Sequence, residues 1–151
     1  MIVLDTNVIS EIFRPSPDPA VMAWLQQQPE DVVYTTAITR GEMLYGVNIK
    51  PEGRQKETLR VGLLRIFAVR FPGRVLSYDG DAADAHAVFS AMRRLQGRPV
   101  SQSDAMIAGI VHSRGAALAT RNVRDFEGCD ITLIDPWDEP AQRSGVNPSS
   151  R

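Results

Sequence analysis

Three acidic residues that lie far apart in the chain, Asp5, Glu42 and Asp104, have the types and surroundings needed for catalysis. Each follows or lies within an apolar segment, where a lone carboxylate is costly to bury. If the three face one crevice, they repel one another and their pKa values rise unless a cation neutralises them. Oxygen ligands of this kind suit Mg²⁺ or Mn²⁺. We therefore expect a divalent metal site that activates a water for phosphodiester hydrolysis.

The first acid, Asp5, directly follows a short apolar run, residues 2–4. Such a run is typical of a strand buried on both faces of a parallel sheet. Ligands bind outside the carboxyl ends of these strands, so Asp5-Thr6-Asn7 is a functional candidate by position. Alternatively, Asp5 or Thr6 only caps the helix expected over residues 8–13. The residues leave both interpretations open.

The second acid, Glu42, lies in a helix predicted over residues 37–48, between two glycines. At helical spacing it shares the apolar flank of Ile38 and Tyr45, which predicts a half-buried carboxylate. The adjacent glycines would leave backbone free for the close approach of a ligand. Alternatively, Glu42 is a surface residue beside Arg40.

The third acid, Asp104, stands near the start of another predicted helix. Ser101, three residues earlier, would form a capping box with it. However, Ile107, Ala108 and Val111 continue from Asp104 at helical spacing, so the acid begins the core-facing stripe. This pattern favours an inward-facing carboxylate over a simple cap.

Polar residues follow an apolar strand a second time, as Asp5 follows residues 2–4. Thr120-Arg121-Asn122 comes directly after a strand expected over residues 116–119, and Asp125 lies one turn later. Arg121 and Arg124 are the candidates for phosphate contacts at this strand end. The remaining strands are expected at 31–34, 75–76 and 130–134.

Two further helices are expected to bury apolar stripes. In the helix over residues 51–70 the stripe includes Leu59, Leu63, Ile66 and Phe67; in the following helix it includes Ala85, Val88, Phe89, Met92 and Leu95. Asp79 or Asp81 should cap this second helix.

Composition narrows the functional classes. The chain has 151 residues, 43% hydrophobic and 23% charged, which predicts one globular domain over residues 1–137 and a mobile tail over 138–151. A net charge of −1 gives no overall attraction to nucleic acid. Cys129 is the only cysteine, which excludes an internal disulfide, and His86 and His112 do not suggest an acid–base pair. No signal peptide or membrane-length apolar run is present, so a cytoplasmic location without membrane contact is expected.

Several motifs in this order resemble those of PIN-domain ribonucleases, specifically VapC toxins of the FitB-like branch. They are Leu4-Asp5-Thr6-Asn7-Val8-Ile9-Ser10, Gly41-Glu42-Met43-Leu44-Tyr45-Gly46-Val47, Asp104-Ala105-Met106-Ile107-Ala108, Ala119-Thr120-Arg121-Asn122 and Asp135-Pro136-Trp137. The resemblance implies a Rossmann-like α/β/α sandwich with a short, mostly parallel central sheet. It also implies Mg²⁺- or Mn²⁺-dependent cleavage of RNA, expected to be structured RNA. The partner implied is a small antitoxin that inhibits a homodimer of the toxin and contacts DNA through its own DNA-binding segment.

By this resemblance, Asp5, Glu42 and Asp104 are the metal ligands. Many relatives have a fourth acid where this chain has Asn122. As a catalytic residue, Asn122 can still orient a water or accept a bond through its carbonyl, but it brings no charge, so a second metal does not follow from the resemblance. Asp125 could compensate if the turn brings it inward. Thr6, Asn7 and Thr120 are expected to support the site.

Two other functional classes stay open at this point. The chain could be a catalytically weak binding module that joins a DNA-binding antitoxin to regulate transcription. It could also be an aspartyl phosphotransferase or receiver domain, although Asn7 stands where such phosphatases need a second acid.

Overall fold

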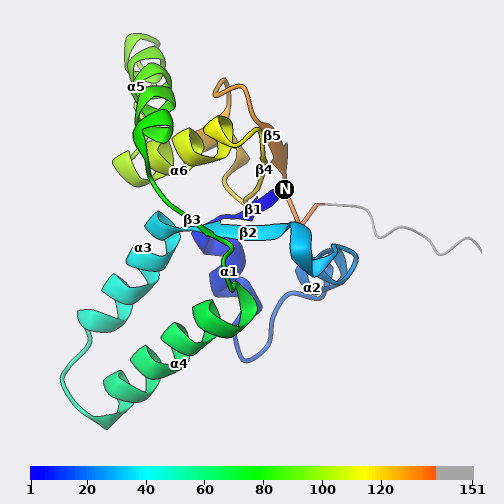
Figure 1. Ribbon diagram of the computed structural model, residues 1–151, viewed down its shortest axis with the longest axis vertical. Helices are drawn as coiled ribbons and strands as arrows, with labels where there is room; N and C mark the ends of the chain where they lie inside the picture. The colour runs from blue at the N-terminus through cyan, green and yellow to red at the C-terminus, as the bar shows by residue number, and fades with distance from the viewer. Residues whose placement is uncertain (139–151) are drawn as a thin grey trace, which may run out of the picture.

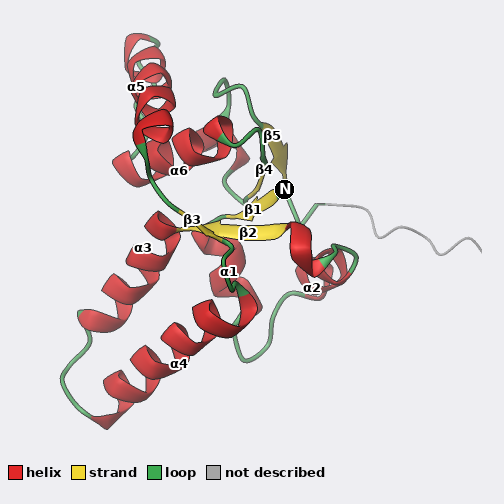
Figure 2. Ribbon diagram, in the orientation of Figure 1, coloured by secondary structure: helices red, strands yellow, loops and turns green. Residues whose placement is uncertain are grey.

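The computed structural model describes residues 1–138 and has one five-stranded sheet at its centre (Figure 2). The strands are β1 (Ile2–Leu4), β2 (Val33–Thr36), β3 (Val75–Leu76), β4 (Ala117–Ala119) and β5 (Thr132–Ile134). Their order is β3-β2-β1-β4-β5, and every neighbouring pair is parallel. The prediction of a short, mostly parallel sheet is therefore confirmed. The expected mobile tail falls largely outside the described residues.

Helices cover both faces of this sheet (Figure 1). They are α1 (Thr6–Ile12), α2 (Pro19–Gln26), α3 (Ala37–Asn48), α4 (Arg54–Arg70), α5 (Gly80–Leu95) and α6 (Gln102–Ser113), with short 3-10 helices η1 (Glu30–Val32) and η2 (Val123–Phe126). One apolar cluster joins α5 and α6 to the sheet through Val3, and the other joins α1, α2 and α4 through Leu4. Consecutive residues of β1 thus enter opposite cores, which confirms the α/β/α sandwich and the strand buried on both faces.

The order of the strands identifies where a ligand site should lie. From β1 the chain adds β2 and β3 on one side, then crosses to add β4 and β5 on the other. Ligands of open α/β sheets bind beside the carboxyl ends of the strands at such a switch point. Here the switch lies between β1 and β4, so Asp5 and Thr120, the residues after these strands, lie at its mouth.

Close packing of α5 against α6 positions the helix that carries Asp104. A Cβ atom at Gly109 of α6 would lie 2.3 Å from the carbonyl oxygen of Ala82 in α5. Only glycine permits this approach, because real Cβ atoms do not come so near to backbone oxygen.

The predicted burial of two apolar stripes is partly wrong. Leu59 of α4 is 40% exposed, and Val88 and Leu95 of α5 are 73% and 88% exposed. Both helices extend beyond the edge of the sheet (Figure 1), so helical spacing alone overestimates how much of each stripe is covered. Within the described residues, no helix has the length and apolar content needed to cross a membrane.

Candidate active site

Asp5 occupies the centre of the site, where it both caps α1 and lies buried at the carboxyl end of β1. Its side chain, in a residue only 4% exposed, accepts a hydrogen bond from the Thr6 backbone N–H at 2.8 Å and so caps α1. The other carboxylate oxygen accepts from the Thr120 hydroxyl at 2.7 Å and from the Asn7 amide at 3.1 Å. The two positions are therefore compatible: Asp5 caps α1 and is also the buried acid at the switch point between β1 and β4.

Thr120 connects the carboxyl ends of β1 and β4. Its hydroxyl oxygen, completely buried, donates to Asp5 and accepts from the Asn122 backbone N–H at 3.1 Å and from the Asn7 amide at 3.3 Å. The Asn7 side-chain oxygen in turn accepts from the Arg121 backbone N–H at 3.2 Å. Asn7 and Thr120, two of the residues expected to support the site, thus fix the position of the Asp5 carboxylate.

Glu42 joins this cluster through Thr6. The Thr6 hydroxyl donates to Glu42 Oε1 at 2.9 Å and lies 3.1 Å from the hydroxyl of Thr39, which is buried in α3. The prediction of a half-buried Glu42 is wrong, because the residue is exposed and its neighbour Tyr45 is 67% exposed. Ile38, at the start of the same flank, packs against the cluster of α5 and α6, so the flank is covered there and exposed at Glu42 and Tyr45.

Asp104 combines a capping interaction with partial burial. Its backbone N–H donates to the Ser101 hydroxyl at 3.1 Å, so Ser101 caps α6. Burial raises the pKa of the half-buried Asp104 carboxyl, a hydrogen bond with Ser101 opposes the rise, and the negative charge of Asp125 adds to it. Asp125 is therefore near enough to Asp104 to affect its ionisation.

Burial and the other two acids determine the electrostatics of Asp5. Burial is the main cause that raises the pKa of Asp5, and hydrogen bonds from Thr120 and Thr6 oppose it. Repulsion by Asp104 and Glu42 raises this pKa further. The ionised form of Asp5 is thus less favourable here than in water, a cost that a nearby cation would reduce.

Asn122 and Asp125 belong to the turn after β4. Asn122 precedes η2, and its side chain, which is exposed, makes no described hydrogen bond. Its carbonyl accepts from the Asp125 backbone N–H at 3.0 Å, which forms the turn. Arg121 and Arg124, on either side of Asn122 in this segment, are both exposed at the same end of the sheet.

The acids have the chemistry of a metal site but not a closed set of ligands. All three offer carboxylate oxygens as ligands. The raised pKa values of Asp5 and Asp104 mean that ionising these carboxyls costs more free energy than in water, and a bound divalent cation would reduce that cost. Among residues 1–138, however, no three His, Cys, Asp or Glu side chains converge closely enough to hold an ion by themselves. The arrangement fits an ion such as Mg²⁺, which binds through one or two carboxylates and keeps waters and substrate phosphates as further ligands.

Other catalytic groups are engaged elsewhere. His86 Nδ1 lies 2.7 Å from the Tyr78 hydroxyl, and His112 lies 3.9 Å from Asp130. Burial raises the pKa of the Cys129 thiol, which disfavours the reactive thiolate.

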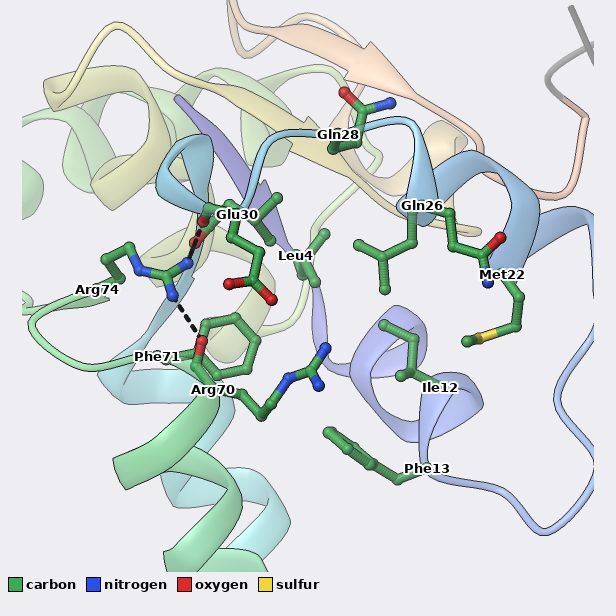
Figure 3. A pocket seen from close by; sticks show the side chains of 12 residues that line it. Leu4, Ile12, Phe13, Met22, Gln26, Gln28, Glu30, Arg70, Phe71 and Arg74 are labelled. Carbon is green, nitrogen blue, oxygen red and sulfur yellow. Dashed lines mark hydrogen bonds between the residues drawn. The ribbon is translucent and has the colours of Figure 1, made fainter.

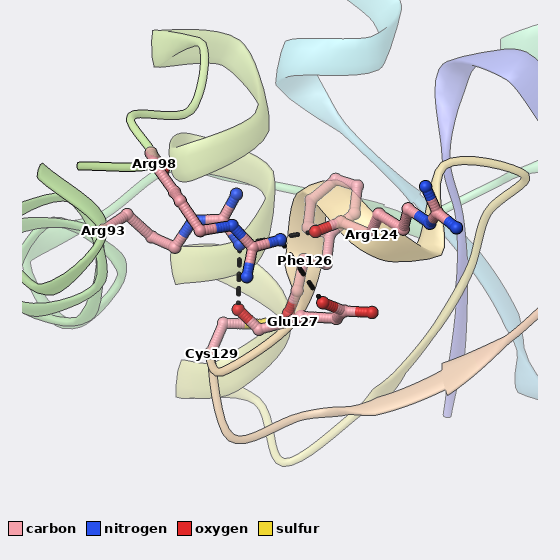
Figure 4. Close-up of polar contacts among 6 residues, drawn as sticks. All are labelled: Arg93, Arg98, Arg124, Phe126, Glu127 and Cys129. Atoms are coloured by element: carbon pink, nitrogen blue, oxygen red, sulfur yellow. Dashed lines mark hydrogen bonds and ion pairs between the residues drawn. The ribbon is translucent and has the colours of Figure 1, made fainter. Parts of the chain in front are cut away.

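Sequence reasoning missed Arg93, a buried arginine that holds the turn carrying Arg124 and Asp125 (Figure 4). Its guanidinium donates to the carbonyls of Arg98 at 2.8 Å, Glu127 at 3.1 Å and Arg124 at 3.3 Å. The figure also shows the side chain of Arg124 directed away from Arg93. A charged residue inside the stripe of α5 was the only sequence signal for this role.

Sequence reasoning also missed Glu11, a buried acid at the far end of α1. It accepts hydrogen bonds from the Asp18 backbone N–H at 2.8 Å and from Arg14 at 3.0 Å. These contacts, the Asp18 bond first, lower the pKa of Glu11.

The chain is similar to known proteins over nearly its whole length. The family model described as PIN domain matches residues 2–129. The VapC ribonuclease Y4jK of Sinorhizobium fredii is 37% identical, over 93% of this chain and 100% of the relative. The tRNA(fMet)-specific endonuclease VapC of Shigella flexneri is 33% identical, over 89% of this chain and 96% of the relative.

Among solved structures, that of FitAB bound to an IR36 DNA fragment matches with a TM-score of 0.84 and 34% identity, over 93% of this chain and 98% of the matched chain. The strand order, the switch-point site and these likenesses agree with the resemblance drawn from the motifs. The chain belongs to the PIN-domain family, in the group of the VapC and FitB proteins.

Proposed function

We propose that this protein is a metal-dependent endoribonuclease, the toxin of a type II toxin–antitoxin pair. The observation that carries the proposal is the buried Asp5 at the β1–β4 switch point, whose pKa is raised by burial and by Asp104 and Glu42. Relatives named as a ribonuclease and as a tRNA-specific endonuclease support RNA as the substrate.

The residues of the site have two kinds of role, metal binding and positioning of the metal ligands. Asp5, Glu42 and Asp104 would hold Mg²⁺ or Mn²⁺, which supplies charge neutralisation and activation of a water when bound. Thr120 and Asn7 keep the Asp5 carboxylate in place, and Thr6 orients Glu42.

The turn after β4 completes the site. Asn122 brings an amide but no charge to the position of the fourth acid, and Asp125 contributes negative charge beside Asp104. Arg121 and Arg124 would contact phosphates of the RNA, because arginine binds them in a bidentate manner. Since no histidine pair faces the acids, cleavage should leave 5′-phosphate and 3′-hydroxyl ends.

A cleavage assay tests the proposal. The protein without its partner should cut a structured RNA, with an initiator tRNA transcript as probe, in the presence of Mg²⁺ or Mn²⁺. Glu42→Gln should abolish cutting while RNA binding persists; Glu127→Gln, another exposed glutamate outside the acid cluster, is the control. Ends bearing 2′,3′-cyclic phosphate, or full activity in excess EDTA, would contradict this mechanism.

The partner of this chain would be an antitoxin, as the FitAB complex suggests. A hollow of about 310 Å³ lies between α1, α2 and the end of α4, and Phe13, Met22 and Arg70 are among its lining residues (Figure 3). None of the candidate acids lines it. We assign this surface to the antitoxin, whose DNA-binding segment would bring the complex to DNA.

Matched exposed residues can test this assignment. Phe13 and Leu59 are both 40% exposed, but only Phe13 lines the hollow. Phe13→Ser should weaken binding of the protein encoded by the neighbouring gene, and Leu59→Ser should not. Light scattering of the chain alone should report the mass of a homodimer; the mass of a monomer at micromolar concentration would contradict that part of the proposal.

A catalytically weak binding module is the second candidate function. It is favoured by the lack of three converging acids within residues 1–138 and by Asn122 in the fourth position. In that case the antitoxin would still bind, but the purified chain would not cut RNA.

A further inference from the structure

The turn after β5 has no role in the site described so far, although Asp135-Pro136-Trp137 is one of the motifs of the resemblance. The Asp135 side chain accepts from the Trp137 backbone N–H at 3.0 Å, and the Asp135 carbonyl accepts from Asp138 N–H at 3.1 Å. Pro136 is buried between them. This tight turn fixes the indole at the carboxyl edge of the sheet, the edge where Asp5 lies.

The side chain that this indole supports is Arg121. The Arg121 guanidinium carbon lies 5.0 Å from the centroid of the Trp137 ring, within the range of a cation–π contact. The two turns are adjacent because the Thr120 backbone N–H donates to the Ile134 carbonyl at 2.9 Å. The Arg121 backbone is also held, by its hydrogen bond to Asn7. Both ends of Arg121 are therefore positioned relative to the acid cluster.

No described acid forms an ion pair with Arg121. Among residues 1–138, its guanidinium forms no ion pair within 4.0 Å, whereas Arg14, Arg60, Arg98 and Arg114 each pair with a carboxylate. The charge of Arg121 helps to lower the pKa of Glu11, but the carboxylate oxygens of Glu11 accept their hydrogen bonds from Asp18 and Arg14. Stacking on a ring face leaves the N–H edge of a guanidinium free for a bidentate acceptor.

We propose that Trp137 is a positioning residue for substrate: it holds the Arg121 guanidinium in a fixed orientation at the carboxyl end of the sheet, the end that also carries Asp5, ready to bind a phosphate of the RNA. This inference rests on the proposed nuclease function. An RNA backbone that approaches several acids is repelled by them, so a cation fixed at the same end of the sheet would help to hold it. A flexible arginine would lose more conformational entropy on binding than one already stacked.

A double-mutant cycle on RNA binding tests the inference. The variants are Trp137→Leu, Arg121→Ala and the double variant of the full chain; Trp137→Phe keeps a ring and is the conservative control. Affinity for the tRNA probe is measured by fluorescence anisotropy in EDTA, so that nothing is cut, and at several salt concentrations. Measurements are made well below the melting temperature of each variant, since Trp137 also packs against the apolar cluster of Leu4.

The expected pattern is one of coupling. Trp137→Leu should weaken RNA binding roughly 3- to 10-fold, and Trp137→Phe should largely restore it. Arg121→Ala should also weaken binding and should lower the salt slope by about one. In the Arg121→Ala background, Trp137→Leu should have no further effect, a coupling that a merely structural role would not produce.

A second readout uses tryptophan fluorescence. The chain has two tryptophans, so Trp24→Phe leaves Trp137 as the only one. Its emission should change when RNA is added and should respond to Arg121→Ala.

Other outcomes would overturn the inference. Effects of the two substitutions that multiply, or an Arg121→Ala effect without any Trp137→Leu effect, would contradict it even where wild type binds and cuts RNA. Loss of antitoxin binding with unchanged RNA affinity would assign Arg121 to the protein partner instead. Wild type that neither binds nor cuts RNA would overturn the inference together with the proposed function.

Discussion

A buried acid lies at each end of α1, yet the pKa values of the two acids are shifted in opposite directions. Asp5 is 4% exposed and Glu11 is 7% exposed. Around Glu11, a backbone N–H and Arg14 lower the pKa, and the ionised form is stabilised. Around Asp5, burial and further acids raise the pKa despite hydrogen bonds from Thr120 and Thr6. Burial alone therefore does not distinguish the two acids; the direction of the pKa shift does, and it makes Asp5 the candidate for a functional acid.

This contrast suggests different purposes. Glu11 joins α1 to the residue that caps α2, Asp18, within one segment of chain. Asp5 is held in place by residues from distant segments, but its charge is left without a cation among the described residues. Glu11 thus stabilises the fold, whereas in our proposal Asp5 serves a metal ion, which would offset the burial and repulsion that raise its pKa.

The largest expected effect comes from Asp5→Asn. Cleavage of RNA should fall by more than about 100-fold, because loss of a ligand should exceed the 10–100-fold typical of residues that orient one. The melting temperature without metal should stay the same or rise, since an unfavourable charge is removed. Single-turnover cleavage and thermal denaturation measure both. A large loss of stability together with unchanged cleavage would show that Asp5 is only a structural cap.

Thr120→Val should have the next largest effect. The substitution keeps the shape but removes the hydroxyl that donates to Asp5 at 2.7 Å, so cleavage should fall about 10- to 100-fold. Stability should also fall by about 1–3 kcal/mol, because buried polar groups lose their partner. Thr120→Ser keeps the hydroxyl and should restore most of the activity. If Val and Ser behave alike, the hydroxyl does not position Asp5.

A smaller effect is expected from Arg93→Lys. Lysine keeps the charge but lacks the planar fork that reaches three carbonyls, so the turn of Arg124 and Asp125 should loosen. Cleavage should decrease by less than about 10-fold, because Arg93 supports the turn and does not orient a candidate metal ligand directly. Arg94→Lys, on the exposed side of the same helix, is the control. Equal effects of the two substitutions would exclude a specific role of Arg93.

Glu11→Gln should affect stability and not activity, which sharpens the comparison with Asp5. In the folded protein the pKa of Glu11 is lowered, so its stabilisation is complete above the ordinary value of 4.5 and is lost as pH falls through the folded pKa. For Asp5 the sign is reversed: its unfavourable contribution grows as pH rises from 3.8 through the raised folded pKa.

Denaturant unfolding at several pH values can test these signs. Near pH 7, Glu11→Gln should be less stable than wild type, and the difference should shrink well below pH 4.5. Asp5→Asn should show a difference of the opposite sign that also shrinks in acid. A Glu11→Gln variant as stable as wild type at neutral pH would contradict this account.

Local pattern was sufficient to predict much of the fold. The parallel sheet was predicted correctly from the apolar run at residues 2–4 and from the order of the motifs, and α3 over 37–48 from its cap. These predictions succeeded because burial and capping depend on neighbouring residues. The exposure of Val88, Leu95 and Glu42 was not predicted, because it depends on how far a helix extends past the sheet.

Long-range contacts account for the rest of the site. The bond between Asp5 and Thr120 spans 115 residues, and that between Thr6 and Glu42 spans 36. Sequence spacing cannot specify such pairs. The buried Arg93 and Glu11 were missed for the same reason, since their partners are mostly backbone groups, which no residue type reveals.

A calorimetric titration of Mn²⁺ into wild type, Asp5→Asn and Glu11→Gln tests the central claim most directly. The account predicts that wild type and Glu11→Gln bind Mn²⁺ with similar affinity, and that Asp5→Asn binds it much more weakly while remaining folded. Unchanged Mn²⁺ affinity in Asp5→Asn would contradict the claim that the two buried acids of α1 differ because one of them awaits a metal.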